Sequence, residues 1–251
     1  MPARALILNA DDLGYDPAVT RGILRALREG VVSSTTFMVN TPHSLAAAQQ
    51  VREGGGALAI GLHLNLARGA PLSAGFPEHL LSRGQLSEAQ AAALPPEVVE
   101  AEAHAQLQRL EQLLGRPATH VDVHKHLHRH PDVLQGLASA ARAAGLPVRS
   151  IDPAMRAALQ ARGVRTNDHF IGDAGAEAYW TLDELERRLA ALPSDGVVEL
   201  MCHPGYAPET LQSGYAQQRE VELHTFLHPR ARALLAGAGV PVADFRVLHA
   251  A

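Results

Sequence analysis

Near its start the chain carries the stretch Ala5-Leu6-Ile7-Leu8-Asn9-Ala10-Asp11-Asp12, in which a short apolar run ends in two adjacent carboxylates. The apolar run is typical of a buried strand. Because burying an unpaired carboxylate is very costly, a strand that ends in two of them needs cations or water at that end. The stretch therefore predicts a strand over about residues 5–10 and a polar site beyond it.

Outward from this strand, three further apolar runs each carry a histidine near their end. They are Ile60-Gly61-Leu62-His63-Leu64, His120-Val121-Asp122-Val123-His124 and Glu199-Leu200-Met201-Cys202-His203-Pro204. In barrels of parallel strands the active site lies at the carboxyl ends of the strands, so these imidazoles are expected to meet Asp11 and Asp12. Carboxylates and imidazoles gathered from several strand ends indicate a metal-dependent hydrolase on an α/β scaffold.

Strand-like runs alternate with helical patterns along the chain, which predicts βα units around a mainly parallel sheet. Further strands are expected at about residues 33–39, 57–64, 197–202 and 240–247, with another ending at His124 and shorter units near Val148 and Phe170. Helices are expected from Asp16-Pro17 to Gly30, from Thr41-Pro42 to Gly54, from Glu97 to Leu114 with Gly115 as C-cap, from Pro131 to Gly145, and from the capping box Thr181–Glu184.

The length of 251 residues suits one large domain, so a single domain is expected over residues 1–251. Residues 67–97 differ from the rest, because Gly, Pro and Ser interrupt every period there, as in Gly69-Ala70-Pro71-Leu72-Ser73. A connection this long is uncommon in a compact domain unless it has a function. The segment is therefore expected to form a loop or subdomain over the site.

The bulk composition excludes several classes of protein. With 47% hydrophobic and 19% charged residues the chain is expected to fold around a substantial core. A net charge of −4 without any basic run argues against nucleic acid as a partner. The single cysteine, Cys202, excludes an internal disulfide and fits a reducing compartment. No apolar run approaches the roughly 18–20 residues that span a membrane, so we expect a cytoplasmic protein without membrane insertion.

The adjacent carboxylates suit two different roles. Neighbouring residues on a strand point to opposite faces, so Asp11 and Asp12 cannot both ligate one ion unless the backbone turns there. One carboxylate would bind a metal while the other stays free as a base. The alternative is a helix start, in which Asp12 satisfies backbone donors ahead of Gly14. Two such caps side by side would be redundant, which favours the functional interpretation.

Four histidines, His124, His126, His128 and His130, alternate along the chain and would share one face if the strand continued that far. Four imidazoles are too many for one small ion, so His124, nearest the strand's end, is expected to be the ligand. His126 and His128 are expected to line the substrate pocket or to orient the ligands, and His130 to belong to the start of the next helix. Asp122 would either fix a histidine tautomer or belong to the pocket.

The two other strand-end histidines also have structural alternatives. A lone histidine on an apolar strand, such as His63, is usually a satisfied core residue, but the other strand-end groups favour a ligand. Pro204 biases His203 toward an extended conformation that would aim its ring at the barrel mouth. His203 is therefore a candidate general acid, and its alternative role is to anchor a loop. Cys202 points the other way and is expected to be buried and inert.

In their order along the chain these motifs resemble those of the YdjC-like carbohydrate deacetylases. The matching segments are Asn9-Ala10-Asp11-Asp12-Leu13-Gly14, Gly30-Val31-Val32-Ser33-Ser34-Thr35-Thr36, Gly61-Leu62-His63-Leu64, Asp122-Val123-His124-Lys125-His126-Leu127-His128 and Glu199-Leu200-Met201-Cys202-His203-Pro204-Gly205. The resemblance extends from residue 5 to about residue 223, where Arg219-Glu220-Val221-Glu222-Leu223 is similar to a late Arg-x-x-Glu-Leu element of the family.

The resemblance implies a distorted (β/α) barrel of about seven parallel strands, of the NodB-like glycoside hydrolase/deacetylase type. It also implies that an N-acetyl group is removed from an amino sugar. A divalent cation would be held by Asp12, His63 and His124, with Asp11 as the base. The family is generally described with magnesium, which is the ion expected first, whereas two imidazoles and a carboxylate favour zinc on ligand type.

Aromatic residues make up only 4% of the chain, which is thin for a long polysaccharide groove. Tyr206 is one of the few that could stack on a sugar ring, with Tyr15, Tyr179 and Trp180. A small soluble carbohydrate is therefore the expected partner, and a homodimer is a candidate assembly. The alternatives are another metal-dependent amide or ester hydrolase on the same barrel, and a non-catalytic metal- or sugar-binding protein. A free Asp11 speaks against the latter, because binding alone needs no base.

Overall fold

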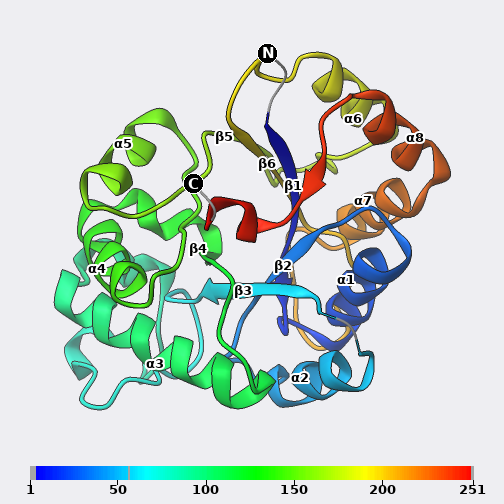
Figure 1. Cartoon of the computed structure of the whole chain (residues 1–251). Helices are drawn as coiled ribbons and strands as arrows, with labels where there is room; N and C mark the ends of the chain where they lie inside the picture. The colour runs from blue at the N-terminus through cyan, green and yellow to red at the C-terminus, as the bar shows by residue number, and fades with distance from the viewer. Residues whose placement is uncertain (1–3, 56, 250–251) are drawn as a thin grey trace.

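The computed structural model describes residues 4–55 and 57–249, and its centre is one sheet of seven strands (Figure 1). The strands are β1 (Ala5–Leu13), β2 (Ser34–Phe37), β3 (Ala59–Leu64), β4 (Val121–Val123), β5 (His169–Ile171), β6 (Val197–Cys202) and β7 (Val242–Ala243). Their order is β4-β3-β2-β1-β6-β5, with β7 paired to β1. Every pairing between these strands is parallel, as predicted.

Strand β1 lies in the middle of the sheet. It pairs with β6 over Ala5–Ala10 on one side. On its other side the first half of β1 pairs with β7 and the second half with β2. All nine residues of β1 are buried as a result. The two carboxylates of this strand therefore lie at the centre of the edge where the parallel strands end, the position at which such sheets hold their sites.

The sheet curls but does not close. Strands β4 and β5 form its two edges, and within residues 4–55 and 57–249 no pairing joins them. Beyond β4, an isolated parallel bridge joins Val121 to Val148, so one further residue pairs at that edge of the sheet. The helices surround the curled sheet on its outside (Figure 1). This arrangement confirms the expected distorted barrel of about seven parallel strands.

The helices are α1 (Pro17–Glu29), α2 (Ser44–Glu53), α3 (Pro96–Leu114), α4 (Pro131–Ala143), α5 (Pro153–Ala161), α6 (Leu182–Ala190), α7 (Gln217–Leu227) and α8 (Pro229–Gly237). Four of the described helices, α1, α3, α4 and α6, begin close to the residues that the sequence marks, whereas α5, α7 and α8 were not predicted. The Asp16 side chain caps α1 at the amide of Ala18, and the Thr181 side chain caps α6 at the amide of Glu184. Gly115 ends α3 in the left-handed conformation, with a φ of 69°. These three predictions are confirmed.

Two expectations about the chain path are corrected. Helix α2 begins at Ser44 instead of Thr41-Pro42, because the carbonyl of Thr41 first accepts from the Ser44 amide in a turn. The alternating histidines do not share a strand face, since β4 ends at Val123 and residues 124–129 form a short 3₁₀ segment, η3 (His124–Arg129). Within η3, Lys125 and His126 both adopt positive φ, at 57° and 52°, which ends the extended chain.

The segment 67–97 contains two short 3₁₀ helices, η1 (Glu78–Leu80) and η2 (Glu88–Ala93). Leu80, Ala91 and Leu94 of this segment are buried against the main hydrophobic core. Helix η2 packs beside η3, which follows the carboxyl end of β4. The segment thus reaches the strand ends at which the sequence predicts a cluster of acids and imidazoles. None of the described helices is both long and apolar enough to cross a membrane.

Candidate active site

Asp11 and Asp12 are neighbours within β1, and their side chains face different partners, as the alternation of a strand predicts. Asp12 has a φ of 75°, and the pairing of β1 with β2 is irregular between Ala10 and Leu13. A left-handed conformation in a residue with a side chain costs about 1–3 kcal/mol and is typical of functional sites. Asp11 faces a buried arginine, and Asp12 faces two imidazoles.

Asp12, His63 and His124 bring three potential ligand atoms together. Asp12 Oδ1 lies 3.2 Å from His63 Nε2 and 3.1 Å from His124 Nδ1. The two ring nitrogens are 3.1 Å apart, and all three residues are buried. They come from β1, from β3 and from the residue after β4, so the parallel register of these strands places them side by side.

The spacing of these three atoms fits a divalent cation. Ligands bonded to one ion at about 2.0–2.2 Å lie roughly 2.8–3.6 Å from one another at tetrahedral or octahedral angles. Asp12 Oδ1 is buried, yet within the described residues it has no hydrogen-bond donor of acceptable geometry. Buried polar atoms are normally satisfied, so an unsatisfied carboxylate oxygen that faces two imidazoles marks a cluster that could hold a cation.

Asp122 lies behind His63 and fixes its tautomer. His63 Nδ1 donates to Asp122 Oδ1 at 2.6 Å, which leaves Nε2 free to face Asp12. Asp122 also accepts from the hydroxyl of Thr36 at 2.9 Å, and it has no exposed surface. Burial alone would lower the pKa of His63, but the neighbouring carboxylates, Asp122 first, raise it to about 10. A carboxylate behind a ligating histidine orients the ring and increases its basicity.

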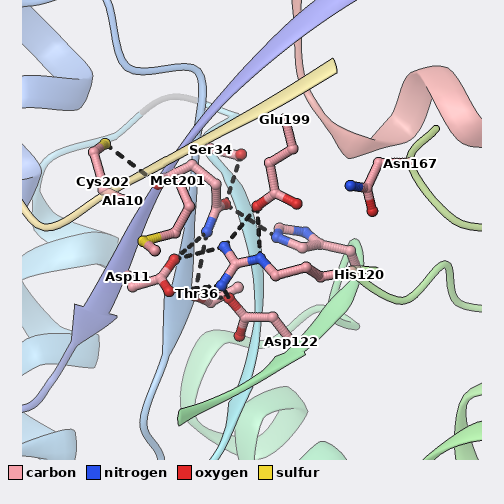
Figure 2. Close-up of polar contacts among 12 residues, drawn as sticks. Ala10, Asp11, Ser34, Thr36, His120, Asp122, Asn167, Glu199, Met201 and Cys202 are labelled. Atoms are coloured by element: carbon pink, nitrogen blue, oxygen red, sulfur yellow. Dashed lines mark hydrogen bonds and ion pairs between the residues drawn. The ribbon is translucent and has the colours of Figure 1, made fainter. Parts of the chain in front are cut away.

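Arg149 is a fully buried guanidinium that three carboxylates share. It donates to the two oxygens of Asp11 at 2.6 and 2.7 Å, and it lies 2.8 Å from Asp122 Oδ2 and 2.6 Å from Glu199 Oε1. Figure 2 shows Asp11, Asp122 and Glu199 converging on one point inside the sheet. We call these four residues the Arg149 cluster. Removing one partner from such a cluster would leave a buried charge uncompensated, at a high cost in stability.

The Arg149 cluster keeps Asp11 ionised. Burial would raise the pKa of Asp11, but the guanidinium of Arg149 outweighs it and holds the pKa well below its usual value. At Glu199 burial dominates instead and raises the pKa to about 7. Asp11 Oδ1 also accepts from the amide of Asn9, whereas Arg149 is the one described partner of Oδ2. One direction at Oδ2 is therefore open to a water molecule.

Asp11, Asp12, His63 and His124 open into a cleft of about 580 Å³. The 67–97 segment contributes Arg68 and Glu88 to its wall, and residues near the start of α7 contribute Tyr215 and Arg219. An ion pair between Lys125 and Glu88 ties η3 to η2 at the rim. The 67–97 segment thus forms part of the cleft wall.

His126 lines the cleft because of the left-handed turn at Lys125–His126. Arg129 stabilises the turn, because its guanidinium donates to the carbonyls of Lys125 at 2.9 Å and of His126 at 3.1 Å. Burial lowers the pKa of His126 to about 3, so its ring is neutral. His128 stands 5.9 Å behind it, measured between ring centroids, and is completely buried. The pocket wall therefore includes His126 and excludes His128.

His203 follows β6 and also lines the cleft. Its backbone amide donates to Glu222, and its ring packs edge-on against Tyr215 with centroids 5.3 Å apart. Burial lowers the pKa of His203 to about 4, although Asp11 and Asp12 act in the opposite direction. Its Nδ1 has no hydrogen-bond partner within the part of the chain that the structure describes.

The structure does not bring every predicted residue to the cleft. Tyr206 lies outside the cleft wall, and its hydroxyl instead accepts a hydrogen bond from Arg25 at 3.0 Å on the outer surface of α1. Asp122 lies behind His63 and does not line the cleft. Cys202 is fully buried, with its thiol donating to the carbonyl of Asn9, as predicted for an inert residue.

Sequence reasoning missed the two arginines of the site. Arg219 stands in the Arg-x-x-Glu-Leu element, so its motif was a usable signal, but no role was attached to it. Arg149 lies outside every quoted motif and follows a single β-like residue, Val148. Tyr215 is likewise a wall residue that the aromatic candidates did not include.

A curled parallel sheet that gathers an Asp–His–His cluster at its strand ends defines an α/β barrel-like protein with a site suited to a cation. The YdjC-like protein family matches residues 5–237 of this chain. A chitooligosaccharide deacetylase from Serratia marcescens is 36% identical over 98% of this chain and 99% of its own length. The chain therefore belongs to the YdjC-like family, which confirms the resemblance seen in the motifs.

Solved structures agree with this assignment. A protein from Enterococcus faecalis, named as a candidate for cellobiose-phosphate cleavage, has a TM-score of 0.85 and 28% identity, and the match covers 98% of this chain and 99% of that one. The Xyl-CE4 domain of a multidomain xylanase, from the hindgut metagenome of Trinervitermes trinervoides, has a TM-score of 0.53 at 14% identity, covering 99% of this chain and 90% of that one. This second likeness shows the fold alone.

Proposed function

We propose that this protein is a metal-dependent carbohydrate deacetylase that removes an N-acetyl group from an amino sugar in a short soluble oligosaccharide or glycoconjugate. The observation that carries the proposal is the presence, in one cleft, of a cation-compatible triad and a separate ionised carboxylate, Asp11. The Serratia relative, named a chitooligosaccharide deacetylase, supports the substrate class. A cleft of about 580 Å³ suits a small ligand.

Asp12, His63 and His124 are the proposed ligands of the ion. At such a site a divalent cation supplies polarisation of the acyl oxygen and a lowered pKa for a water molecule. Two imidazoles and a carboxylate suit zinc on ligand type. The family resemblance favours magnesium, which is the ion we propose first.

Asp11 is the proposed general base. Its open direction at Oδ2 can accept the proton of a water that attacks the acyl carbon. Because Arg149 stabilises the ionised form, Asp11 is always available as a base, but it is a weak one. Proton transfer to a weak base is efficient only when the attacking water is itself made more acidic, so Asp11 and the triad must act together.

His203 is the proposed general acid for the departing amine. Its ring lines the same cleft as Asp11, and its Nδ1 has no partner among the described residues. The low pKa makes the protonated ring a strong acid, so it gives up a proton readily once it has gained one during the reaction. His126 would face the sugar from the opposite wall.

The direct test is acetate release from N-acetylated chitooligosaccharides. Metal-free protein, prepared with a chelator, should be inactive, and added Mg²⁺ or Zn²⁺ should restore release. Cleavage of O-acetyl esters without any amide cleavage would favour another hydrolase on the same barrel. Saturable sugar binding without acetate release would favour a binding protein. Either result would overturn the proposed activity.

A further inference from the structure

Arg219 is a buried arginine at the mouth of the cleft whose side chain is held at two points. It lies in the first turn of α7 and is 3% exposed. Its Nη2 donates to Asp12 Oδ2 at 2.5 Å, and its Nε donates to the carbonyl of Tyr215 at 3.0 Å. Two hydrogen bonds from different atoms of one planar guanidinium fix its orientation.

The third nitrogen of this guanidinium is free. Arg219 Nη1 is buried, and within residues 4–55 and 57–249 it has no hydrogen-bond acceptor. An unsatisfied buried donor on a charged group is costly, so this direction is expected to be filled in the working state. The Tyr15 ring lies 5.5 Å from the guanidinium carbon, and both residues line the cleft. A ligand in the cleft is therefore the partner that the free donor lacks.

Asp12 places this donor beside the proposed reaction centre. One oxygen of Asp12 faces His63 and His124, and the other is bound by Arg219. Asp11 and His203, the proposed base and acid, line the same cleft. A guanidinium offers N–H donors and no acceptor atom, so the role open to Arg219 there is to donate a hydrogen bond.

We propose, building on the deacetylase function, that Arg219 is a catalytic residue whose Nη1 binds the acyl oxygen of the substrate while Nη2 stays bound to Asp12. When water adds to the acyl carbon, the carbonyl electron pair moves to this oxygen, and Nη1–H stabilises the negative charge. Collapse then breaks the C–N bond and returns the pair to the carbonyl. The amide and water become acetate and a protonated amine, and Arg219 is unchanged.

The competing explanation is that Arg219 merely neutralises Asp12 or supports the fold. Its carbonyl accepts from the amide of Gly205 at 3.1 Å and so supports the corner after His203. That contact is made by the backbone, so a side-chain substitution leaves it in place. The two explanations therefore differ in what a change of the side chain alone should do.

The test uses the metal-loaded full chain with Arg219→Lys and Arg219→Ala. An ammonium can reach either Asp12 or the acyl oxygen but not both. We expect kcat to fall about 10²–10³-fold in both variants, the usual effect of removing one donor from such a site. KM, the thermal midpoint and the metal Kd, measured by calorimetry on metal-free protein, should change far less. Added guanidinium ion should restore part of the activity of Arg219→Ala. Acetate should inhibit the wild type more strongly than Arg219→Lys.

The matched control is Arg187→Lys, which alters an exposed arginine paired with Glu184 and should leave kcat unchanged. If kcat falls less than threefold in both Arg219 variants, or if excess metal restores it fully, Arg219 does not bind the reacting oxygen. Loss of folding in Arg219→Ala with full activity in Arg219→Lys would also overturn the assignment. Absence of acetate release by the wild type would overturn the deacetylase proposal itself, and the Arg219 role with it.

Discussion

Asp11 and Asp12 are neighbours of the same chemical type, yet they belong to two different clusters. Arg149 donates a hydrogen bond to each oxygen of Asp11. Arg149 has no exposed surface and also forms ion pairs with Asp122 and Glu199. Asp12 is bound on one oxygen by Arg219 and faces two imidazoles with the other. In the first cluster each carboxylate is paired with the same buried guanidinium, whereas in the second Asp12 Oδ1 and Arg219 Nη1 have no hydrogen-bond partner among the described residues and belong to residues that line the cleft.

The difference shows how two adjacent carboxylates acquire separate functions. The alternation of side chains along β1 places the two carboxylates on different sides of the chain. On one side a guanidinium fixes the charge of Asp11. On the other, the unsatisfied Asp12 Oδ1 and Arg219 Nη1 indicate where external groups bind. Substitutions in the two clusters should therefore have different signatures.

The largest effect is expected from the imidazoles of the triad. His63→Ala or His124→Ala should abolish binding of the divalent ion and with it acetate release, because two protein ligands rarely hold such an ion tightly. Metal content after gel filtration and calorimetric titration would measure this. His79→Ala, at an exposed histidine of the 67–97 segment, is the control. Full metal occupancy in either variant would remove that histidine from the site.

Exchanging the charge at each aspartate separates base from ligand. Asp11→Asn should retain the ion but lower turnover by roughly 10²–10⁴-fold, the value of a positioned general base. Asp12→Asn should weaken metal binding, and excess cation should recover part of its activity. Cation should not rescue Asp11→Asn. Turnover and metal Kd should be measured on both variants. If Asp11→Asn loses the metal and Asp12→Asn keeps it, Asp12 is the base and Asp11 the metal ligand.

Asp122 belongs to both clusters, so its substitution tests how far they are coupled. Asp122→Asn keeps an acceptor for His63 Nδ1 but removes the charge that makes the ring a better ligand. We expect metal affinity to weaken about 10–100-fold, the usual consequence of losing a carboxylate behind a ligating histidine. Metal titration at constant pH measures the shift. An unchanged Kd would mean that Asp122 serves Arg149 alone.

Asp16 provides a structural reference in the same stretch, with no contact to the triad among the described hydrogen bonds. Its carboxylate accepts from the amides of Ala18, Glu209 and Thr210 and from the Thr210 hydroxyl. Asp16→Ala should lower the free energy of unfolding by about 1–2 kcal/mol, as for other lost helix caps. Metal affinity should not change.

The pH dependence of this effect follows from the direction of the shift. Burial would raise the pKa of Asp16, but the hydrogen bonds, led by those from Thr210, lower it below its usual value. A depressed folded pKa gives stability that is present above the unfolded value, about 3.9, and is lost as the pH falls through the folded value. Urea unfolding at pH 7 and near pH 3 should therefore show the wild type and Asp16→Ala converging in acid. A constant difference would contradict this role.

The sequence by itself determined the parallel α/β architecture, the helix caps at Asp16 and Thr181, and the strand ends that carry Asp12, His63 and His124. These features are local, because periodicity and capping depend on residues a few positions apart. Since parallel strands end at one edge, knowing that three groups lie at strand ends was nearly sufficient to bring them together.

The tertiary structure alone decided which arginine meets which carboxylate, and which histidines reach the cleft. Arg149 is 138 positions from Asp11, and Arg219 is 207 positions from Asp12, so no periodicity in the chain records these pairs. The left-handed turn at Lys125–His126 likewise packs against η2, through the ion pair between Lys125 and Glu88, two residues that are 37 positions apart in the chain. Buried ion pairs are selected by the geometry of the assembled core, because only there does desolvation make an unpaired charge too costly to keep.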